Sequence, residues 1–232
     1  MSAISCRNLC KTFRQGEEII TGLDDVCLDI DEGSFVCLSG PSGSGKTTLL
    51  NAMGGLDTPD SGEITVGAHR VDQLSRTELA DMRLNNIGFV FQAYNLIPVL
   101  TARENVEFVM QVQGIATTER RSLADQVLAE VGLSGLEGRL PAQMSGGQQQ
   151  RVAVARAIAN EPALVLADEP TANVDSKTGK ALLDLMHRLN QEKGVTFFFS
   201  THEEAVMKRA HRLLQLEDGI ILNDGIQTDK WN

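Results

Sequence analysis

The run with the most distinctive chemistry is Gly40-Pro41-Ser42-Gly43-Ser44-Gly45-Lys46-Thr47, which stands between two patterned segments. Residues 35–38 before it are apolar, as in a buried strand, and the residues from Thr48 to Met53 after it have a helical pattern. Glycines at this turn let successive N–H groups point at a phosphate chain, and the helix start adds its positive dipole end. Lys46 has the reach to contact the β- and γ-phosphates, and the Thr47 hydroxyl is placed to ligate magnesium. The run therefore predicts a site for a nucleoside triphosphate.

Two carboxylates end an apolar segment further along the chain. Residues 164–167 are typical of a buried strand, and Asp168 and Glu169 follow them directly. Beside a phosphate-binding loop, the first acid holds magnesium directly or through water, so we expect Asp168 to share the metal with Thr47. Glu169 is then placed to polarise the water that attacks the γ-phosphate. Without the loop, the same letters would be a strand that ends in a polar turn before Pro170.

Two more polar residues stand at the ends of predicted strands. His202 follows the strand after Asp168, where it could bond the γ-phosphate and orient the attacking water. Gln92 follows residues 89–91, and its neutral amide can touch magnesium or that water. The remaining histidines have no such placement, and we expect them on the surface: His69, His187 and His211.

A second candidate anion site is the run Ser145-Gly146-Gly147-Gln148, which precedes a predicted helix. Ser145 is a good cap for that helix, and the glycines permit close approach of the backbone to an anion. This run has no lysine of its own, which makes sense if it completes the site of another molecule.

The order of the elements indicates an α/β fold. Short strands with hairpin-like turns fill the first 39 residues, and the part after residue 145 alternates helix and strand, which requires a parallel sheet covered by helices. Ligands bind such sheets at the carboxyl ends of the strands. Residues 93–144 have helical patterns and no strong strand, so we expect one domain over 1–232, with a helical subdomain at 93–144 inserted into a nucleotide-binding core and β-subdomain at 1–92 and 145–232. The expected strands are 3–7, 22–30, 34–38, 61–66, 87–91, 164–167 and 195–199, and the expected helices 101–112, 117–131, 149–159 and one capped by Asp175 or Ser176.

The composition narrows the class of protein. The 232 residues include 31 acidic and 21 basic ones, for a net charge of −10, and no basic cluster that would displace counterions from nucleic acid. We therefore expect no nucleic-acid partner. No apolar run is long enough to cross a bilayer, and the N-terminus does not read as a secretory signal. None of the four cysteines is in a C-x-x-C pair, so we expect them to be reduced and to serve as small apolar residues.

With these motifs in order along almost its whole length, the chain resembles the ATP-binding cassette of transporters. Gly40–Thr47 is similar to the Walker A motif and Leu164–Asp168 to Walker B, with Glu169 as the catalytic glutamate. The resemblance also implies an adenine-stacking ring at Phe13, a Q-loop glutamine at Gln92, a signature motif at Ser145–Gln148, a D-loop aspartate at Asp175 and a switch histidine at His202. The alternative for Phe13 is a core or surface phenylalanine, and the stacking role is the one we expect.

The resemblance implies an α/β fold with a P-loop (RecA-like) core and mostly parallel sheet, an antiparallel N-terminal β-subdomain and an inserted helical subdomain. It implies an ATPase that uses Mg²⁺ and forms a head-to-tail homodimer when ATP is bound. Its partner would be an integral membrane permease, placing the chain peripherally on the cytoplasmic face of the inner (plasma) membrane. The sequence of residues 86–98 and 141–151 resembles that of the lipoprotein-releasing (LolD-like) and macrolide-exporter (MacB-like) ATPases. This resemblance implies no specific cargo.

Two positions depart from the family pattern. The D-loop reads Thr171-Ala172-Asn173-Val174-Asp175, where Ala-Leu-Asp is usual at its end, so communication across the dimer could differ. Glu203 stands where an aspartate commonly follows the histidine. A regulatory, scaffolding module of a membrane complex, as in cell-division cassettes, is an alternative function, and a cassette acting on DNA or the ribosome is a further one. The apolar residues just after Gln92 are either core or a groove for a helix of the membrane partner: Tyr94, Leu96, Ile97, Val99 and Leu100.

Overall fold

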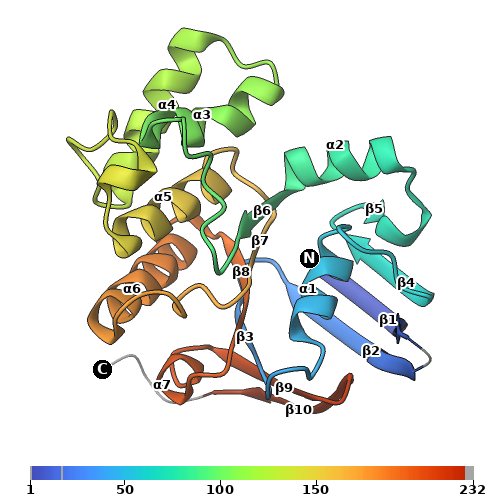
Figure 1. Ribbon diagram of the computed structural model, residues 1–232. Helices are drawn as coiled ribbons and strands as arrows, with labels where there is room; N and C mark the ends of the chain where they lie inside the picture. Colours follow the sequence, from blue (N-terminus) through green and yellow to red (C-terminus); the bar gives the residue numbers. More distant parts are fainter. Residues whose placement is uncertain (1, 17, 228–232) are drawn as a thin grey trace.

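The computed structural model describes residues 2–16 and 18–227 and shows a central sheet with a second sheet on one side and a helical arm on the other (Figure 1). The central sheet has six strands in the order β10-β9-β3-β8-β7-β6. Neighbouring strands from β9 to β6 run parallel, and β10 is antiparallel to β9. These strands are β3 (Phe35–Ser39), β6 (Ile87–Val90), β7 (Leu164–Ala167), β8 (Thr196–Thr201), β9 (Arg212–Glu217) and β10 (Ile220–Ile226).

The N-terminal sheet is antiparallel, in the order β2-β1-β4-β5. It is built on one long hairpin whose strands continue well beyond the segments predicted from sequence. Pairing along this hairpin reaches Gln15 and Glu18, so both strands extend beyond residues 3–7 and 22–30, the segments expected from the sequence. The strands are β1 (Ser2–Gln15), β2 (Glu18–Asp31), β4 (Ser61–Val66) and β5 (His69–Arg70).

Two hydrophobic cores lie on the two faces of the central sheet. Alternation along β3 sends Phe35 and Cys37 into one core and Val36 and Leu38 into the other. The first core is closed by α5 and α6, and the second by α1 together with the N-terminal sheet (Figure 1). The helices on the sheet are α1 (Lys46–Met53), α2 (Arg76–Asn86), α5 (Gly146–Ile158), α6 (Ser176–Lys193) and the short α7 (Glu204–Met207).

The helical arm consists of α3 (Ala102–Val112) and α4 (Thr117–Glu130), which pack against each other and against α5. Its connection to the core is held by Asn105, which is fully buried. The Asn105 amide accepts from the Ile97 N–H and donates to the carbonyls of Ile97, Leu100 and Thr101. One side chain therefore fixes the entire segment that leads into the arm. Short 3₁₀ turns at Val71–Gln73 and Pro141–Gln143 complete the elements.

The predicted fold class is confirmed, including the antiparallel N-terminal sheet, the mostly parallel core and the helical insertion. The elements that were not predicted include α2, β9 and β10, together with the short β5 and α7. In α2 only Met82 is buried, so the helix shows no clear apolar stripe, although its capping box, Ser75 with Glu78, is legible in the sequence.

The prediction that three histidines lie on the surface was wrong for two of them. His69 is exposed. His187 and His211 are partly buried, with their Nε2 atoms 3.1 Å apart, and both rings pack against Phe35. Sequence could not find this pair, because helix α6 and the start of β9 bring together residues 24 positions apart.

No helix among residues 2–16 and 18–227 combines the length and the apolar character that crossing a membrane requires.

Candidate active site

One edge of the central sheet carries the polar residues that were predicted at strand ends, because four neighbouring strands end there: Lys46, Gln92, Asp168, Glu169 and His202. β3 leads into the loop before Lys46, and β8 ends beside His202. β7 leads into Asp168, and β6 ends two residues before Gln92. Parallel strands place their carboxyl ends together, so residues more than 150 positions apart along the chain become neighbours.

A hollow of about 460 Å³ opens at this edge. One wall is the hairpin of the N-terminal sheet, where Phe13 is 40% exposed and pairs across the hairpin with Ile20. The Lys11 ammonium lies 5.5 Å from the centre of the Phe13 ring, on which it holds a cation–π contact. The lining residues are Phe13, Ile20, Thr21, Gly22, Ser42, Gly43, Gly45, Lys46, Thr47, Thr48, Gln92, Asp168 and Glu169.

The loop between β3 and α1 is shaped by glycine and closed by its own lysine. Gly43 and Gly45 have φ of 83° and 104°, and a Cβ on Gly45 would lie 2.2 Å from the Gly22 carbonyl oxygen. Lys46 is buried, and its ammonium donates to the carbonyls of Gly40 and Pro41 at 2.8 Å each. A positive charge therefore sits at the centre of the loop, directly before the N-terminus of α1.

A chain of hydrogen bonds connects α1 with the ends of β7 and β8. The Thr47 hydroxyl donates to one Asp168 oxygen at 2.9 Å, and the Ser200 hydroxyl donates to the other at 2.6 Å. Ser200 is fully buried and also accepts from the Glu169 N–H at 3.0 Å. One hydroxyl thus fixes both carboxylate-bearing residues. Sequence analysis did not assign Ser200, and the available signal was a hydroxyl at the end of the strand that follows the acidic one.

Glu169, which lines the hollow, pairs with His202, which is not among the lining residues. His202 Nδ1 lies 3.0 Å from Glu169 Oε1, so the imidazole orients this carboxylate. Glu169 has a φ of 44°, a left-handed conformation that costs about 1–3 kcal/mol for a residue with a side chain. The Ser200 hydroxyl offsets that cost by binding the N–H of the strained residue. The backbone is therefore held so that the carboxylate points along the edge of the sheet.

The run Ser145–Gln148 lies outside this hollow, at the start of α5. Its Ser145 hydroxyl accepts from the Gln148 N–H at 3.3 Å, and the Gln148 side chain accepts from the Ser145 N–H at 2.9 Å. Asp175 also lies apart from the hollow, as the cap of α6, where its carboxylate accepts from Lys177 N, Thr178 N and the Thr178 hydroxyl. The hydroxyl of Thr178 and the backbone N–H groups lower the pKa of Asp175.

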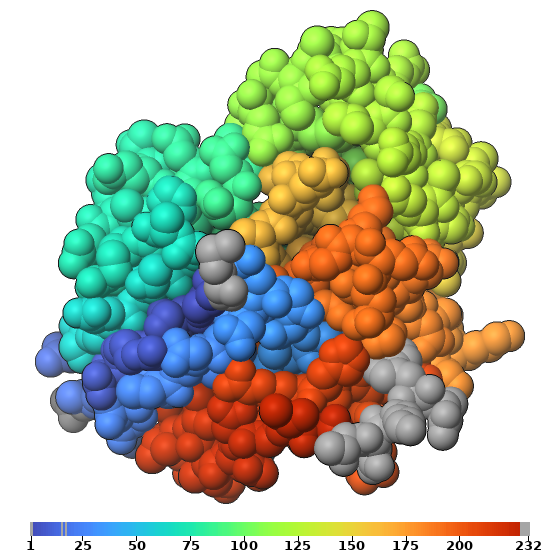
Figure 2. Space-filling model, turned by 180° about the vertical axis from the view of Figure 1, so that it is seen from behind, coloured from blue at the N-terminus to red at the C-terminus, as the bar shows by residue number. Residues whose placement is uncertain are grey.

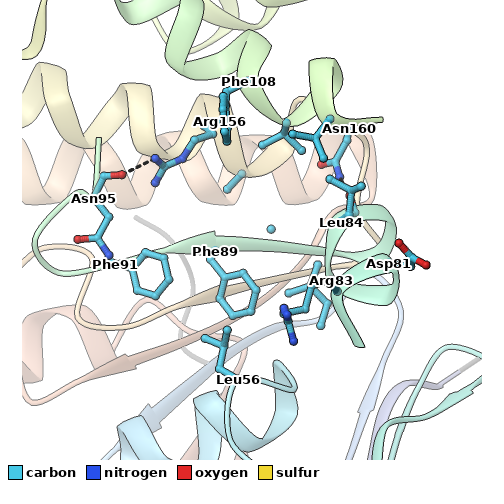
Figure 3. A pocket seen from close by; sticks show the side chains of 16 residues that line it. Leu56, Asp81, Arg83, Leu84, Phe89, Phe91, Asn95, Phe108, Arg156 and Asn160 are labelled. Carbon is cyan, nitrogen blue, oxygen red and sulfur yellow. Dashed lines mark hydrogen bonds between the residues drawn. The ribbon is translucent and has the colours of Figure 1, made fainter. Parts of the chain in front are cut away.

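A second hollow, of about 510 Å³, separates α2 from the helical arm. It opens on the face seen in Figure 2, with residues near position 160 at its floor. The close-up in Figure 3 shows Phe108 at the top, Phe89 and Phe91 in the middle and Leu56 below Phe89. Leu56, Phe108 and Val112 in its lining are 47%, 44% and 57% exposed, so the hollow is an apolar groove open to solvent. The apolar cluster predicted to form such a groove does not line it: Tyr94, Leu96, Ile97, Val99 and Leu100.

Comparison with known proteins agrees with this geometry. The family model for the ABC transporter matches residues 23–172, well over half of the chain. The chain belongs to the ABC transporter family. It is the ATPase cassette of that family, close to the group containing MacB.

The relatives of this cassette include proteins of its own length and much longer ones. It is 46% identical to the uncharacterized ABC transporter ATP-binding protein MJ0796 of Methanocaldococcus jannaschii over 93% of this chain and 94% of that protein. It is 41% identical to the macrolide export ATP-binding/permease protein MacB of Neisseria meningitidis, and spans only 35% of that protein's length.

Solved structures of the cassette MJ0796 have the same fold. A dimeric structure of its post-hydrolysis state, bound to ADP and Pi, superimposes with a TM-score of 0.89 at 44% identity, covering 96% of this chain and 98% of that one. A second dimeric structure of MJ0796 superimposes with the same score.

Proposed function

We propose that this cassette binds ATP in the hollow, pairs head-to-tail with a second copy, and drives an integral membrane permease by closing and reopening that dimer. One observation carries the proposal. The hydrogen-bonded residues Thr47, Asp168 and Ser200 and the pair Glu169–His202 lie beside a loop of the kind that binds phosphate. A structural turn needs no buried lysine at its centre and no carboxylate held in a strained conformation beside it.

The hollow has one region suited to the adenine of ATP and another suited to its phosphates. The exposed face of Phe13 is placed to stack on adenine, and the loop Gly40–Gly45 presents its N–H groups and the Lys46 ammonium to the phosphates. The residues also fit magnesium, because the Thr47 hydroxyl and the Asp168 carboxylate are hard oxygen donors that already meet at 2.9 Å, with the Gln92 amide in the same lining. The cation, when bound, neutralises charge that develops on the phosphates.

Hydrolysis needs a base for the attacking water. We assign this role to Glu169, whose carboxylate takes up the proton as the water oxygen attacks the γ-phosphorus and the bond to the β-phosphate oxygen breaks. His202 acts on that carboxylate, since its Nδ1 lies 3.0 Å from Oε1. The Ser200 hydroxyl binds Asp168 Oδ1, which leaves Oδ2 with the Thr47 hydroxyl, and it also holds the Glu169 backbone N–H.

The motif Ser145–Gln148 and Asp175 have their proposed partners in a second copy. Both lie at helix starts outside the hollow of their own chain, and Ser145 with the glycines that follow offers an anion site without a lysine. Head-to-tail pairing would bring this run onto the γ-phosphate held by the other copy. The dimeric structures of MJ0796, at 44% identity, support such an assembly.

The groove between α2 and the helical arm is the proposed docking site for a short helix of the permease. Its apolar lining and three exposed large side chains suit the apolar face of a helix. MacB relatives are described as ATP-binding/permease proteins, and the part that this cassette matches is a third of their length. The cassette would then work on the cytoplasmic face of the inner membrane, as a peripheral subunit.

Glu169→Gln tests the proposal. Glutamine keeps the reach of glutamate but cannot take a proton, so turnover should fall by about 10²–10⁴-fold while ATP still binds. Size-exclusion chromatography with ATP and magnesium should show a dimer for the variant and mostly monomer for the wild type, with monomer for both in ADP. Wild-type turnover by Glu169→Gln would show that another residue activates the water.

A further inference from the structure

The D-loop, residues 171–175, and the loop after Gln92 are joined by two hydrogen bonds that run in opposite directions. The Tyr94 hydroxyl donates to the backbone carbonyl of Asn173 at 3.0 Å. The Asn173 side chain donates in return to the backbone carbonyl of Gln92 at 2.8 Å. Each loop therefore uses one side chain to hold the main chain of the other, and Asn173 is, with Val174, one of two D-loop residues that stand where the family usually has Ala-Leu.

Tyr94, which reaches the D-loop, lies in a strained turn. Tyr94 and Asn95 have φ of 61° and 49°, two consecutive left-handed residues that carry side chains. The Arg156 guanidinium holds this turn by donating to both of their carbonyls (Figure 3 shows the bond to Asn95). Arg156 also lines the apolar groove. The strained turn is thus tied on one side to a groove residue and on the other to the D-loop.

The tyrosine also covers the start of α5. A Cβ added to Gly146 would lie 2.8 Å from the Tyr94 hydroxyl oxygen and 3.5 Å from the Asn173 carbonyl oxygen. A side chain at position 146 would therefore push directly against the hydroxyl that makes the bond. The glycine keeps open the space in which the two loops and the helix start meet.

The D-loop is a direct continuation of the turn that bears Glu169. The Ala172 N–H donates to the Glu169 carbonyl at 3.2 Å, so a shift of Asn173 moves this turn. At the other end, the backbone carbonyl that accepts from Asn173 belongs to Gln92, whose side chain lines the hollow beside Asp168 and Glu169. The two bonds therefore tie the turn that follows Glu169 to the loop that carries Gln92, and both of these residues line the hollow.

We propose that Tyr94 and Asn173 form an interloop clamp that positions Glu169 and Gln92 for hydrolysis. The proposal adds two positioning residues to the ATPase reaction and needs neither the docking groove nor the membrane partner. Catalysis is sensitive to small displacements of such groups, so loss of one bond should lower the catalytic rate with little effect on ATP affinity. When one bond is lost, the remaining bond alone no longer fixes the two loops. Removal of the second bond should therefore lower the catalytic rate little further.

Steady-state ATPase kinetics of Tyr94→Phe, Asn173→Ala and the double variant test the clamp. Each single change removes one hydrogen bond, which predicts a kcat lower by about two- to tenfold at nearly constant KM. The kcat of the double variant should be no lower than that of the less active single variant, because the two bonds act as one unit. Asn173→Asp, which keeps the size but not the donor, should match Asn173→Ala.

Asn85→Ala is the matched control, because Asn85 is exposed and its side chain donates to the Asp81 carbonyl within α2, away from both loops. It should keep the wild-type kcat. Single variants with wild-type kcat would overturn the clamp, as would losses that multiply in the double variant or losses that only follow a lower Tm.

Hydrogen–deuterium exchange of residues 172–174 tests the clamp without measuring ATP hydrolysis. Its result therefore does not depend on whether the chain is an ATPase. These amides should exchange at least about twofold faster in Tyr94→Phe than in wild type or Asn85→Ala. Unchanged exchange there would refute the clamp even if the rate of hydrolysis falls.

Discussion

Removal of the Ser200 hydroxyl offers the sharpest test of how this edge of the sheet holds its carboxylates. Ser200→Ala takes away the donor to Asp168 Oδ1 at 2.6 Å and the acceptor of the Glu169 N–H at 3.0 Å. The site is fully buried, so water has little room to replace the lost oxygen without a rearrangement of the strand. Thr47 would remain as the bonded partner of the other Asp168 oxygen.

The size of the effect follows from these two bonds. A hydrogen bond to a charged group contributes about 1.5–3 kcal/mol, and the orphaned N–H adds about 1–3 kcal/mol. If only the first is expressed in the transition state, kcat falls by about 10- to 150-fold, since 1.4 kcal/mol is a factor of ten. The free energy of unfolding should fall as well, by about 1–3 kcal/mol, because the folded state keeps an unpaired buried donor.

Thr196→Val provides the matched control, since Thr196 is a buried hydroxyl residue at the opposite end of the same strand. Its Oγ1 accepts from the Gly33 N–H at 3.0 Å, far from the carboxylates, and valine keeps its shape. Urea denaturation should show similar losses of stability for both variants, while ATPase assays should show a lower kcat for Ser200→Ala alone. Equal kcat values for the two variants would refute the argument that Ser200 organises the catalytic edge.

Two further predictions concern parts of the molecule away from the catalytic edge. Burial and the neighbouring His211 lower the pKa of His187, Arg209 lowers it further and Asp184 opposes them, so the protonated form favours the unfolded chain. The contribution of His187 to the free energy of unfolding should therefore be fully present above about pH 6.5 and be lost as the pH falls below it. His187→Gln should flatten this part of a plot of Tm against pH. In the groove, Phe108→Asp should weaken binding of the permease by about 10- to 100-fold with basal ATPase unchanged, because burial of one phenylalanine contributes about 1.5–3 kcal/mol. Val99→Asp, at an apolar residue that is 78% exposed outside the groove, should bind the permease like wild type in the same co-purification assay.

Sequence reasoning succeeded where one short segment carries both the chemistry and its position. The loop before Lys46 and the acidic end of β7 are contiguous motifs, and the rule that parallel strands share a carboxyl edge was enough to bring them together. The same rule places Gln92 in the lining without any knowledge of its contacts.

Interactions made by ordinary residues across long separations could not be predicted. Ser200 is a plain strand residue until β8 lies beside β7, and Tyr94 reads as one more apolar residue until the D-loop meets its hydroxyl. The groove was expected in the cluster that follows Gln92, yet its lining comes from α2, β6, α3 and α5. Of that cluster, Leu96 packs against the hydrophobic core.

The Lys46 ammonium donates to the carbonyls of Gly40 and Pro41. We therefore expect nucleotide binding to replace hydrogen bonds within the loop by hydrogen bonds to phosphate. The ammonium has two hydrogen bonds of 2.8 Å to these carbonyls, and we expect phosphate oxygens to replace one or both carbonyls as its acceptors. Much of the attraction between lysine and phosphate is therefore offset by the bonds given up, so the lysine contributes less to affinity than its charge suggests. The same side chain keeps the loop in its phosphate-ready shape between turnovers, and this spares each incoming nucleotide the entropic cost of ordering it.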